Sequence, residues 1–270
     1  MAEKIDLVII DPQNSFCDPQ KGELYVPGAE HDMKRVSDFV KKMGTKINRI
    51  HVTLDCHHLI DVSHSLMWKN SKGEHPAPFT SFGSKEIKDG IWNPIYPSLI
   101  NKFITYCETL EIGGKYSLCI WPNHCLIGSQ GCCVFLPLFQ SLLEWEEKKK
   151  NNVFHVSKGS NPYTEHYSAV KAEVPEPDDP STQLNTRFIN TIKEADKILV
   201  AGEAGSHCLK FSVEDIADGF NDDSYIKKIV LLEDGTSPVQ SPFVDFPAIQ
   251  EKFVANMKSR GMQVAKTTDF

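Results

Sequence analysis

Cys208 stands where an apolar run changes into a helical pattern. In the stretch LVAGEAGSHCLKFSVEDIADGF (199–220), Gly202 and Gly205 lie in the turn between the two patterns. A thiol at the start of a helix lies beside free N–H groups and the positive end of the helix dipole, which favour a thiolate and can hold an oxyanion. The position suits a nucleophile, although a cysteine there, taken alone, is more often inert packing.

Two charged residues follow other apolar runs. Asp11 ends the run VIID, where Pro12 stops the strand, and Lys158 follows NVFHVS. Taken singly, Asp11 is equally well explained as a turn residue, and Lys158 is better explained as a surface lysine. Together with Cys208 they provide an acid, an ammonium and a thiol at three strand ends, which are the groups for cysteine-centred acyl transfer without a catalytic histidine.

The segment Asp55-Cys56-His57 has the character of a metal site. Residues two apart in an extended segment lie on the same side, so a carboxylate oxygen and an imidazole can converge on one ion. D-x-H is a weak motif by itself, and a third ligand is required. The candidates that the spacing leaves open are His58, His64, His75 and His124.

Five short β-rich runs alternate with helical patterns along the chain. The runs are IDLVIID (5–11), RIHVTLD (49–55), NVFHVS (152–157), DKILVAG (196–202) and IKKIVLLED (226–234). Near-continuous apolar runs suit strands covered on both faces, and their alternation with helices implies a parallel sheet. We predict a three-layer α/β/α fold with a mostly parallel, Rossmann-like central sheet, whose reactive groups lie at the carboxyl ends of the strands.

Helix signals support this alternation. Apolar residues at positions 33, 36, 40 and 43 recur at helical spacing before Gly44, which suits a helix C-cap. After PEPDDP (175–180), a further helix is expected to begin at Thr182 or Asn185. Residues 56–120 interrupt the rhythm with a long loop-rich stretch, and we interpret them as an elaborated crossover within a single domain that covers 1–270.

The composition excludes several classes of partner. The formal net charge is −7, and the dense basic run Lys148–Lys150 suits a solvated helix end rather than a nucleic-acid site. No apolar run reaches the roughly 18 residues of a membrane span. The start MAEKIDLVIID has no signal or transit character, and the eight cysteines form no C-x-x-C pair, so we expect free thiols and a cytoplasmic protein.

Four blocks resemble the isochorismatase-like cysteine hydrolases, and specifically the nicotinamidases (pyrazinamidases), over nearly the whole chain. DPQNSF (11–16) resembles the block with the catalytic aspartate, and LDCHH (54–58) resembles the D-W-H metal block. WPNHCLIGSQG (121–131) is similar to W-P-x-H-C-x-x-G-T-x-G, and GEAGSHC (202–208) is similar to G-V-A-x-x-x-C. VSKG (156–159) supplies the lysine between the last two blocks.

The resemblance implies a role for each matched residue. It makes Asp11, Lys158 and Cys208 a catalytic triad, and it selects His124 as the third metal ligand beside Asp55 and His57. The N–H groups of Ala204 and Cys208, after a cis peptide, would form an oxyanion hole. Phe16 and Trp121 would be two aromatic walls around a substrate ring.

Three residues depart from the family pattern. Cys56 replaces the tryptophan of D-W-H, Asp61 stands where a histidine is usual, and Glu203 replaces an apolar residue before Ala204. Of the remaining histidines, we expect His64 and His75 at the surface, with a position behind the metal ligands as the alternative. Tyr167 is expected either near the site or in the core, and Cys125, Cys132 and Cys133 are interpreted as packing.

The resemblance implies hydrolysis of nicotinamide to nicotinate and ammonia through a cysteine thioester, in NAD salvage. One divalent metal ion is expected, with Zn as the first candidate and Fe or Mn as alternatives. The expected partners are a small carboxamide substrate and further copies of the chain in a homo-oligomer. The alternatives are another cysteine amidohydrolase of this fold, acting on a different small amide or ureide, or a catalytically silent metal-binding protein.

Overall fold

A six-stranded parallel sheet forms the centre of the molecule. The computed structural model describes residues 3–242 and 244–270. The strands run in the order β10-β9-β8-β1-β2-β7, and each neighbouring pair is parallel. Their bounds are β1 (Ile5–Ile10), β2 (Ile47–Asp55), β7 (Phe154–Lys158), β8 (Lys197–Gly202), β9 (Ile229–Leu232) and β10 (Gln263–Ala265).

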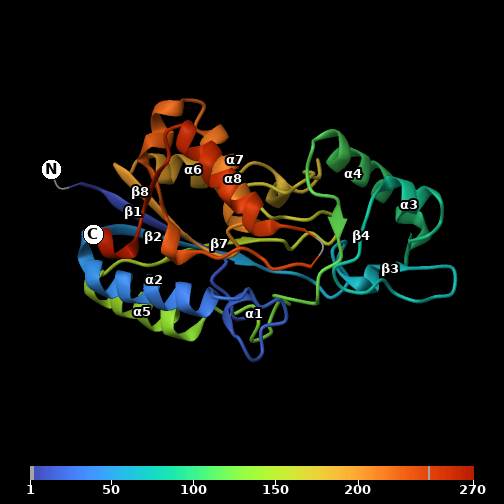
Figure 1. Ribbon diagram of the computed structural model, residues 1–270, viewed down its shortest axis with the longest axis horizontal. Helices are drawn as coiled ribbons and strands as arrows, with labels where there is room; N and C mark the ends of the chain where they lie inside the picture. Colours follow the sequence, from blue (N-terminus) through green and yellow to red (C-terminus); the bar gives the residue numbers. More distant parts are fainter. Residues whose placement is uncertain (1–2, 243) are drawn as a thin grey trace.

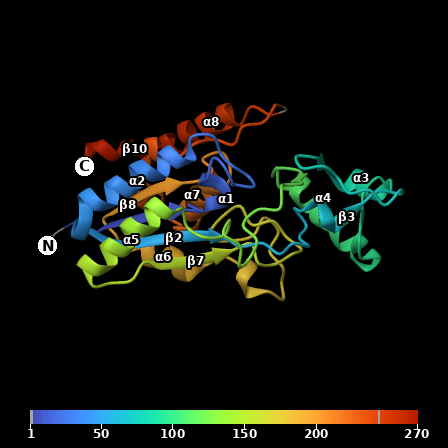
Figure 2. The same cartoon turned by 90° about the horizontal axis from the view of Figure 1, so that it is seen from below.

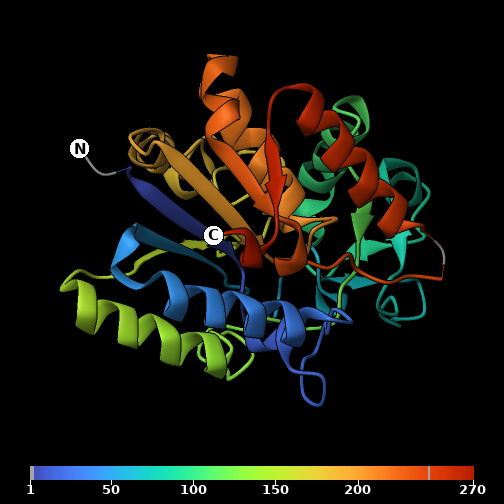
Figure 3. The same ribbon diagram turned by 60° about the vertical axis from the view of Figure 1, so that its left-hand side comes forward.

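Helices cover both faces of this sheet. The helices α2 (Ala29–Met43) and α5 (Leu136–Lys149) lie side by side on one face. The opposite face carries α6 (Thr186–Lys193), α7 (Cys208–Gly219) and α8 (Phe246–Ser259) (Figures 1 and 3). The predicted three-layer α/β/α architecture with a parallel central sheet is therefore confirmed.

The elements form where the sequence patterns place them. All six residues of β1 are buried, as expected for a strand covered on both faces. The helix α2 buries Met33, Val36 and Val40 on one face and ends at Gly44, whose φ of 51° suits glycine. The helix α6 begins after Asn185, whose side chain accepts a hydrogen bond from the Phe188 N–H and caps the helix.

One expectation for the elements needs correction, and another is decided between its two alternatives. The run 226–234 is a strand only over Ile229–Leu232, because Asp223–Lys228 forms a 3₁₀ helix and the next one begins at Glu233. Thr182 closes a separate short 3₁₀ helix, so Asn185 is the start of α6. The sequence patterns also missed α8 and β10, which follow the last predicted strand.

The segment 56–120 builds a second, smaller hydrophobic cluster around Trp68 and Phe103. Figure 2 shows this segment at one end of the molecule, beyond the main sheet. Its elements are β3 (Trp68–Lys69), β4 (Ser81–Phe82), α3 (Ser84–Lys88), β5 (Asn93–Pro94), α4 (Ile100–Ile112) and β6 (Leu118–Cys119), with β3–β5 and β4–β6 pairing antiparallel. The expectation of one domain with an elaborated crossover stays a prediction.

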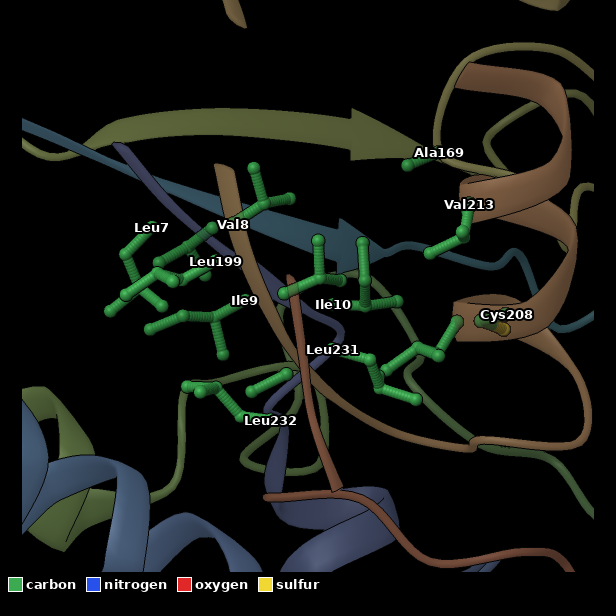
Figure 4. Packing of buried hydrophobic residues seen from close by; sticks show 14 of the residues in the cluster. Leu7, Val8, Ile9, Ile10, Ala169, Leu199, Cys208, Val213, Leu231 and Leu232 are labelled. Carbon is green, nitrogen blue, oxygen red and sulfur yellow. The ribbon is translucent and has the colours of Figure 1, made fainter. Parts of the chain in front are cut away.

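The main core leads directly to Cys208. Figure 4 shows Leu7 of β1 packed beside Leu199 of β8, while Leu231 of β9 lies on the side of the sheet that faces Cys208, at the start of α7. A short helix, α1 (Asn14–Cys17), follows β1. Within residues 3–242 and 244–270, no helix has the length and apolar character needed to cross a membrane.

Gly202 at the end of β8 provides a test of the close approach between β8 and β1. Its φ is 119°, and a Cβ atom there would lie 2.1 Å from the Ile10 carbonyl oxygen. Because the obstacle is main chain, we expect Gly202→Ala to lower the free energy of unfolding by about 3 kcal/mol or more in urea titrations. Gly44→Ala is the control: it also has positive φ, but nothing lies within 4 Å, so its expected cost is about 1 kcal/mol. Equal stability of the two variants would contradict this account.

Candidate active site

The predicted catalytic residues come together at the carboxyl ends of the central strands. From β1 the chain proceeds to β2 and β7 on one side, and β8, β9 and β10 extend the sheet on the other. The strand order therefore reverses between β1 and β8, the place where open α/β sheets form their ligand sites. Asp11 follows β1, Lys158 ends β7, and Cys208 opens the helix after β8.

Lys158 contacts both other members of the predicted triad. Its Nζ atom lies 2.9 Å from Asp11 Oδ2 and 3.7 Å from Cys208 Sγ. The Asp11 carboxylate lies close enough to the Cys208 thiol to raise the pKa of that thiol. All three side chains are buried. The structure thus brings together the acid, the ammonium and the thiol, which are 50 (208 − 158) to 197 (208 − 11) residues apart in the sequence.

Polar side chains from β2 and from the loop after β1 hold Asp11 and Asp55 in place. The Asp11 N–H donates to Thr53 Oγ1 at 2.9 Å, and the Thr53 hydroxyl donates in return to the Asp11 carboxylate. Gln13 pairs with the main chain of Asp55 at both ends, because its Nε2 donates to the Asp55 carbonyl and its Oε1 accepts from the Asp55 N–H, each at 2.7 Å. These bonds fix the ends of β1 and β2 relative to each other.

Two carboxylates surround the Lys158 ammonium. Besides Asp11, Asp55 Oδ1 lies 2.9 Å from Nζ, and the His166 carbonyl accepts a hydrogen bond at 2.8 Å. Burial alone would lower the pKa of Lys158, but the two carboxylates raise that pKa well above its ordinary value. Burial raises the pKa of Asp11, an effect that the ammonium opposes. Lys158 is therefore a fixed positive charge.

The Cys208 thiol is protonated at rest. Burial raises its pKa well above the ordinary value, and Lys158 offsets only part of that effect because Asp11 and Asp55 act in the opposite direction. This direction opposes the thiolate that the helix start was expected to favour. Nucleophilic chemistry at Cys208 requires a base that removes the proton during attack, and Asp11 is in contact with the thiol.

Two main-chain N–H groups of the pocket lining have no acceptor among the described residues. Among the described residues, neither the Ala204 N–H nor the Cys208 N–H donates a hydrogen bond, whereas the N–H groups of Glu203, Gly205 and His207 do. Both Ala204 and Cys208 line one pocket. The Glu203–Ala204 peptide is cis, as the resemblance implies. This arrangement can donate to an oxyanion formed at Cys208.

Asp55, His57 and His124 form a group with the donor set of a metal site. One ligand atom from each lies within 4.8 Å of the others, and all three residues are buried. The Nε2 atoms of His57 and His124 lie 3.0 and 3.4 Å from Asp55 Oδ2. The three donors therefore converge on a common point, which is what one divalent ion requires.

Acceptors behind the two imidazoles orient them toward that point. His57 Nδ1 lies 3.1 Å from Asp61 Oδ2, and His124 Nδ1 lies 2.9 Å from the Pro122 carbonyl oxygen. Metal-binding histidines typically donate their second N–H to such a carboxylate or carbonyl. Asp61, one of the departures from the family pattern, thus supports His57 from behind.

The other histidines separate into buried and exposed ones. His64 is completely buried, with ring centroids 5.2 Å from His57 and 5.5 Å from His124, so its predicted surface position is wrong. It lies inside because its main chain forms an isolated β-bridge with Trp121 and its Nδ1 atom contacts the His58 carbonyl oxygen at 3.0 Å. Burial and the neighbouring imidazoles lower the pKa of His64 to about 4. His58 and His75 are exposed, as expected for His75.

Aromatic side chains wall the pocket in front of Cys208. Phe16 and Trp121 both line it, together with Tyr167. The Trp121 Nε1–H donates to the Tyr167 hydroxyl at 3.1 Å, and the Phe16 ring meets His124 edge-on with centroids 5.5 Å apart. Tyr167 therefore belongs both to the buried core and to the pocket wall. The pocket offers flat apolar surfaces between the thiol and the Asp55 cluster.

Some residues of the site were missed from the sequence. Thr53 lies two positions before Asp55 in β2, so the same alternation that pairs Asp55 with His57 could have found it. Gln13 stands in the same block as Asp11, but only the folded register shows that it reaches Asp55. Glu165, which also lines the pocket, carries no local signal.

All eight cysteines are free. Cys125 is buried, in agreement with a packing role, but Cys133 is exposed and its interpretation as packing is wrong. Cys132 is partly exposed, and its Sγ atom lies 3.6 Å from that of Cys56. Cys208 is the cysteine that contacts both Lys158 and Asp11.

Comparison with known proteins places the fold. No family model and no curated protein matches the chain. Among solved structures, a nicotinamidase/pyrazinamidase from Acinetobacter baumanii has a TM-score of 0.63 at 17% identity, covering 99% of this chain and 98% of that one. Yeast nicotinamidase bound to the inhibitor nicotinaldehyde has a TM-score of 0.61 at 20% identity, covering 97% and 99%.

A pyrazinamidase from Pyrococcus horikoshii in complex with zinc has a TM-score of 0.55 at 17% identity, covering 97% of this chain and 99% of that one. Likenesses at such identities establish a fold and leave the activity to be argued from the site. The chain thus has the three-layer α/β/α fold that the isochorismatase-like hydrolases, including nicotinamidases and pyrazinamidases, share.

Proposed function

We propose that the protein is a nicotinamidase, a cysteine hydrolase that converts nicotinamide to nicotinate and ammonia. The observation that carries this proposal is the buried contact of Lys158 with both Asp11 and Cys208, beside two N–H groups that have no acceptor among the described residues. The proteins that share the fold include enzymes named for this activity. The roles of the individual residues are part of the proposal.

The first step is attack by Cys208 on the amide carbon. Because the thiol is protonated at rest, Asp11 takes its proton as the Sγ–C bond forms. Burial raises the pKa of Asp11, which makes this carboxylate a stronger base than an exposed aspartate. The Lys158 ammonium stays charged and stabilises the negative charge as it moves from Asp11 to the sulfur and the carbonyl oxygen.

The oxyanion of the tetrahedral intermediate accepts hydrogen bonds from the Ala204 and Cys208 N–H groups. One such donor is typically worth about 2.7 to 4 kcal/mol in the transition state. Asp11 returns its proton to the amide nitrogen, the C–N bond breaks, and ammonia leaves a thioester on Cys208. Asp11, again a carboxylate, then takes a proton from water, which cleaves the thioester to nicotinate and restores the thiol.

Asp55, His57 and His124 would hold one divalent metal ion. Their convergent oxygen and nitrogen donors fit such an ion, and zinc is the first candidate, as in the zinc complex of the Pyrococcus horikoshii protein. When bound, the ion supplies a Lewis-acid position for the pyridine nitrogen. Asp55 itself couples this cluster to the triad, since Oδ2 faces the two imidazoles while Oδ1 holds Lys158.

Phe16 and Trp121 would bind the faces of the substrate ring. The hydrogen bond from Trp121 to Tyr167 fixes the indole, so the wall is set before substrate enters. A second candidate is another cysteine amidohydrolase, with a different small amide or ureide as substrate. It is favoured by Glu165, a buried carboxyl group in the pocket wall whose pKa is raised by burial. The cytoplasmic location, the homo-oligomer and the role in NAD salvage stay predictions.

The proposed activity is tested by ammonia release from a panel of small amides, with the metal content of the same protein sample determined. We expect nicotinamide and pyrazinamide to be hydrolysed more efficiently than aliphatic amides and ureides, because the pocket walls are aromatic. A higher kcat/KM for a ureide or an aliphatic amide would favour the second candidate. Absence of ammonia release from every amide by metal-loaded protein would refute the hydrolase proposal.

Cys208→Ala tests the nucleophile. Without the thiol no thioester forms, so kcat for ammonia release should fall on the order of 10⁴-fold or more, while calorimetry should still detect nicotinamide binding. Cys133→Ala, at an exposed cysteine, is the matched control and should keep full activity. Undiminished turnover in the Cys208 variant would remove the proposed mechanism.

His124→Ala tests the metal ligands. Losing one of three converging donors should weaken metal binding by about 100-fold or more, measured by competition with a chelator and by elemental analysis. Nicotinamide affinity should fall with the metal content. His75→Ala, at an exposed histidine, should bind metal like the wild type. Unchanged metal content in the His124 variant would show that the ligand set is wrong.

A further inference from the structure

Glu203 is a buried acid directly beneath the proposed oxyanion hole. It follows β8, and its own carbonyl together with the Ala204 N–H makes one peptide unit. The side chain is completely buried and does not line the pocket in front of Cys208. The sequence pattern that the chain resembles usually has an apolar residue here, whereas this chain has an acid.

The Glu203 carboxyl group shares Ser237 as a hydrogen-bond donor with a second acid, Asp32 of α2. Glu203 Oε2 accepts a hydrogen bond from the Ser237 N–H at 3.2 Å, but Oε1 finds no donor among the described residues. Asp32 has a donor on each oxygen, since the Arg35 guanidinium binds Oδ1 and the Ser237 hydroxyl binds Oδ2. The Arg35 guanidinium thus balances the negative charge of Asp32.

A proton on Glu203 removes the repulsion between the two carboxylates. Two buried carboxylates in contact cannot both ionise without strong repulsion. If Glu203 keeps the proton, its Oε1 becomes a donor to Asp32 and no polar atom of the pair lacks a partner. The charged and titratable groups that face Glu203 are Asp32 and Arg35 from α2 and the buried Cys17 thiol from α1. Burial, and next Asp32, raise the pKa of Glu203 well above its ordinary value.

The same contacts fix the main chain on both sides of Ala204. The Glu203 N–H donates to the Ile10 carbonyl at 2.8 Å, and the Gly205 N–H donates to the Ser237 carbonyl at 2.9 Å. Ser237 therefore binds residue 203 through its N–H and residue 205 through its carbonyl. The residues on both sides of Ala204 are thus held in place, and Ala204 lines the pocket that contains Cys208.

We propose that Glu203 is a positioning residue for the hydrolase reaction: its neutral carboxyl group bonds Asp32 and Ser237 and thereby aims the Ala204 N–H at the oxyanion. This inference rests on the proposed function and deepens it. A proton held by two buried acids links helix α2 to the proposed oxyanion hole, about 170 residues away in sequence (203 against 32).

Kinetics of two Glu203 variants test the positioning role. Glu203→Gln keeps the shape, the donor to Asp32 and the acceptor for Ser237, so we expect its kcat to stay within about threefold of the wild type. Glu203→Ala removes all three, and kcat should fall about 10- to 100-fold with KM nearly unchanged, because the oxyanion exists only after attack. The matched control is Glu173→Gln, at a buried acid paired with Lys115 outside this network, and it should keep the wild-type kcat.

The positioning role is overturned if Glu203→Ala keeps the wild-type kcat, if its loss appears in KM instead, or if Glu203→Gln is impaired as strongly as Glu203→Ala. Should Glu203→Ala fail to fold, the glutamine variant and the proton measurements below still decide the proposal.

The pH dependence of unfolding tests the shared proton independently of activity. A carboxyl group whose pKa is raised in the folded state binds more proton there than in the unfolded chain. Stability from this group is therefore complete below the unfolded pKa, near 4.5, and is lost as pH rises toward the folded pKa. From about pH 5 to 7, the unfolding equilibrium constant of the wild type should rise relative to that of Glu203→Gln, by up to about tenfold per pH unit. Parallel curves would overturn the shared proton.

Infrared spectroscopy separates this inference from the proposed function. Protonated carboxyl absorption should be present in wild-type protein and in Cys208→Ala at neutral pH, and one such band should be lost when Glu203→Gln is introduced. Failure to lose a band would refute the neutral Glu203. If the wild type hydrolyses no amide, the oxyanion role falls with the proposed function, whereas the band and the unfolding curves still decide the state of the proton.

Discussion

The buried ammonium of Lys158 is the interaction on which the site depends. Taking a lysine out of water is costly unless carboxylates surround it closely, and here Asp11 and Asp55 do so, each at 2.9 Å from Nζ. The same ammonium keeps these two buried acids from repelling each other. Removing Lys158 would leave both acids uncompensated at the ends of adjacent strands. The proposed triad and the proposed metal ligands are thus halves of one charge network.

That network requires strand ends that approach very closely. Gly159, directly after Lys158, has φ of 82°, and a Cβ there would lie 2.6 Å from Asp55 Oδ1. Gly202 plays the same part where β8 meets Ile10. Glycines at these positions let the main chain reach the conformation that brings Asp55 to Lys158 and carries the chain toward Ala204. The geometry of the site therefore depends partly on glycines, which have no side chain.

The sequence predicts the parts of this protein that depend on local patterns. The buried strands, the helix over Met33–Met43 with its cap at Gly44, and the gathering of Asp11, Lys158 and Cys208 at strand ends all follow from periodicity and from the geometry of parallel sheets. The raised pKa of Cys208 does not follow, because burial, Asp11 and Asp55 together outweigh Lys158, and these groups come from distant segments. His64 was misplaced for a related reason: its burial depends on a bridge to Trp121, 57 residues away (121 − 64). The surroundings of Glu203 could not be predicted either, because Asp32 and Ser237 come from distant segments of the chain.

The central claim is that Cys208 forms a covalent acyl intermediate under the control of Asp11 and Lys158. The most direct measurement is rapid-quench mass spectrometry of the metal-loaded protein mixed with nicotinamide, followed by peptide mapping. The account predicts a transient nicotinoyl adduct on the peptide that contains Cys208 and on no other cysteine. Ammonia release at full rate with no adduct, or with the adduct on another residue, would contradict it.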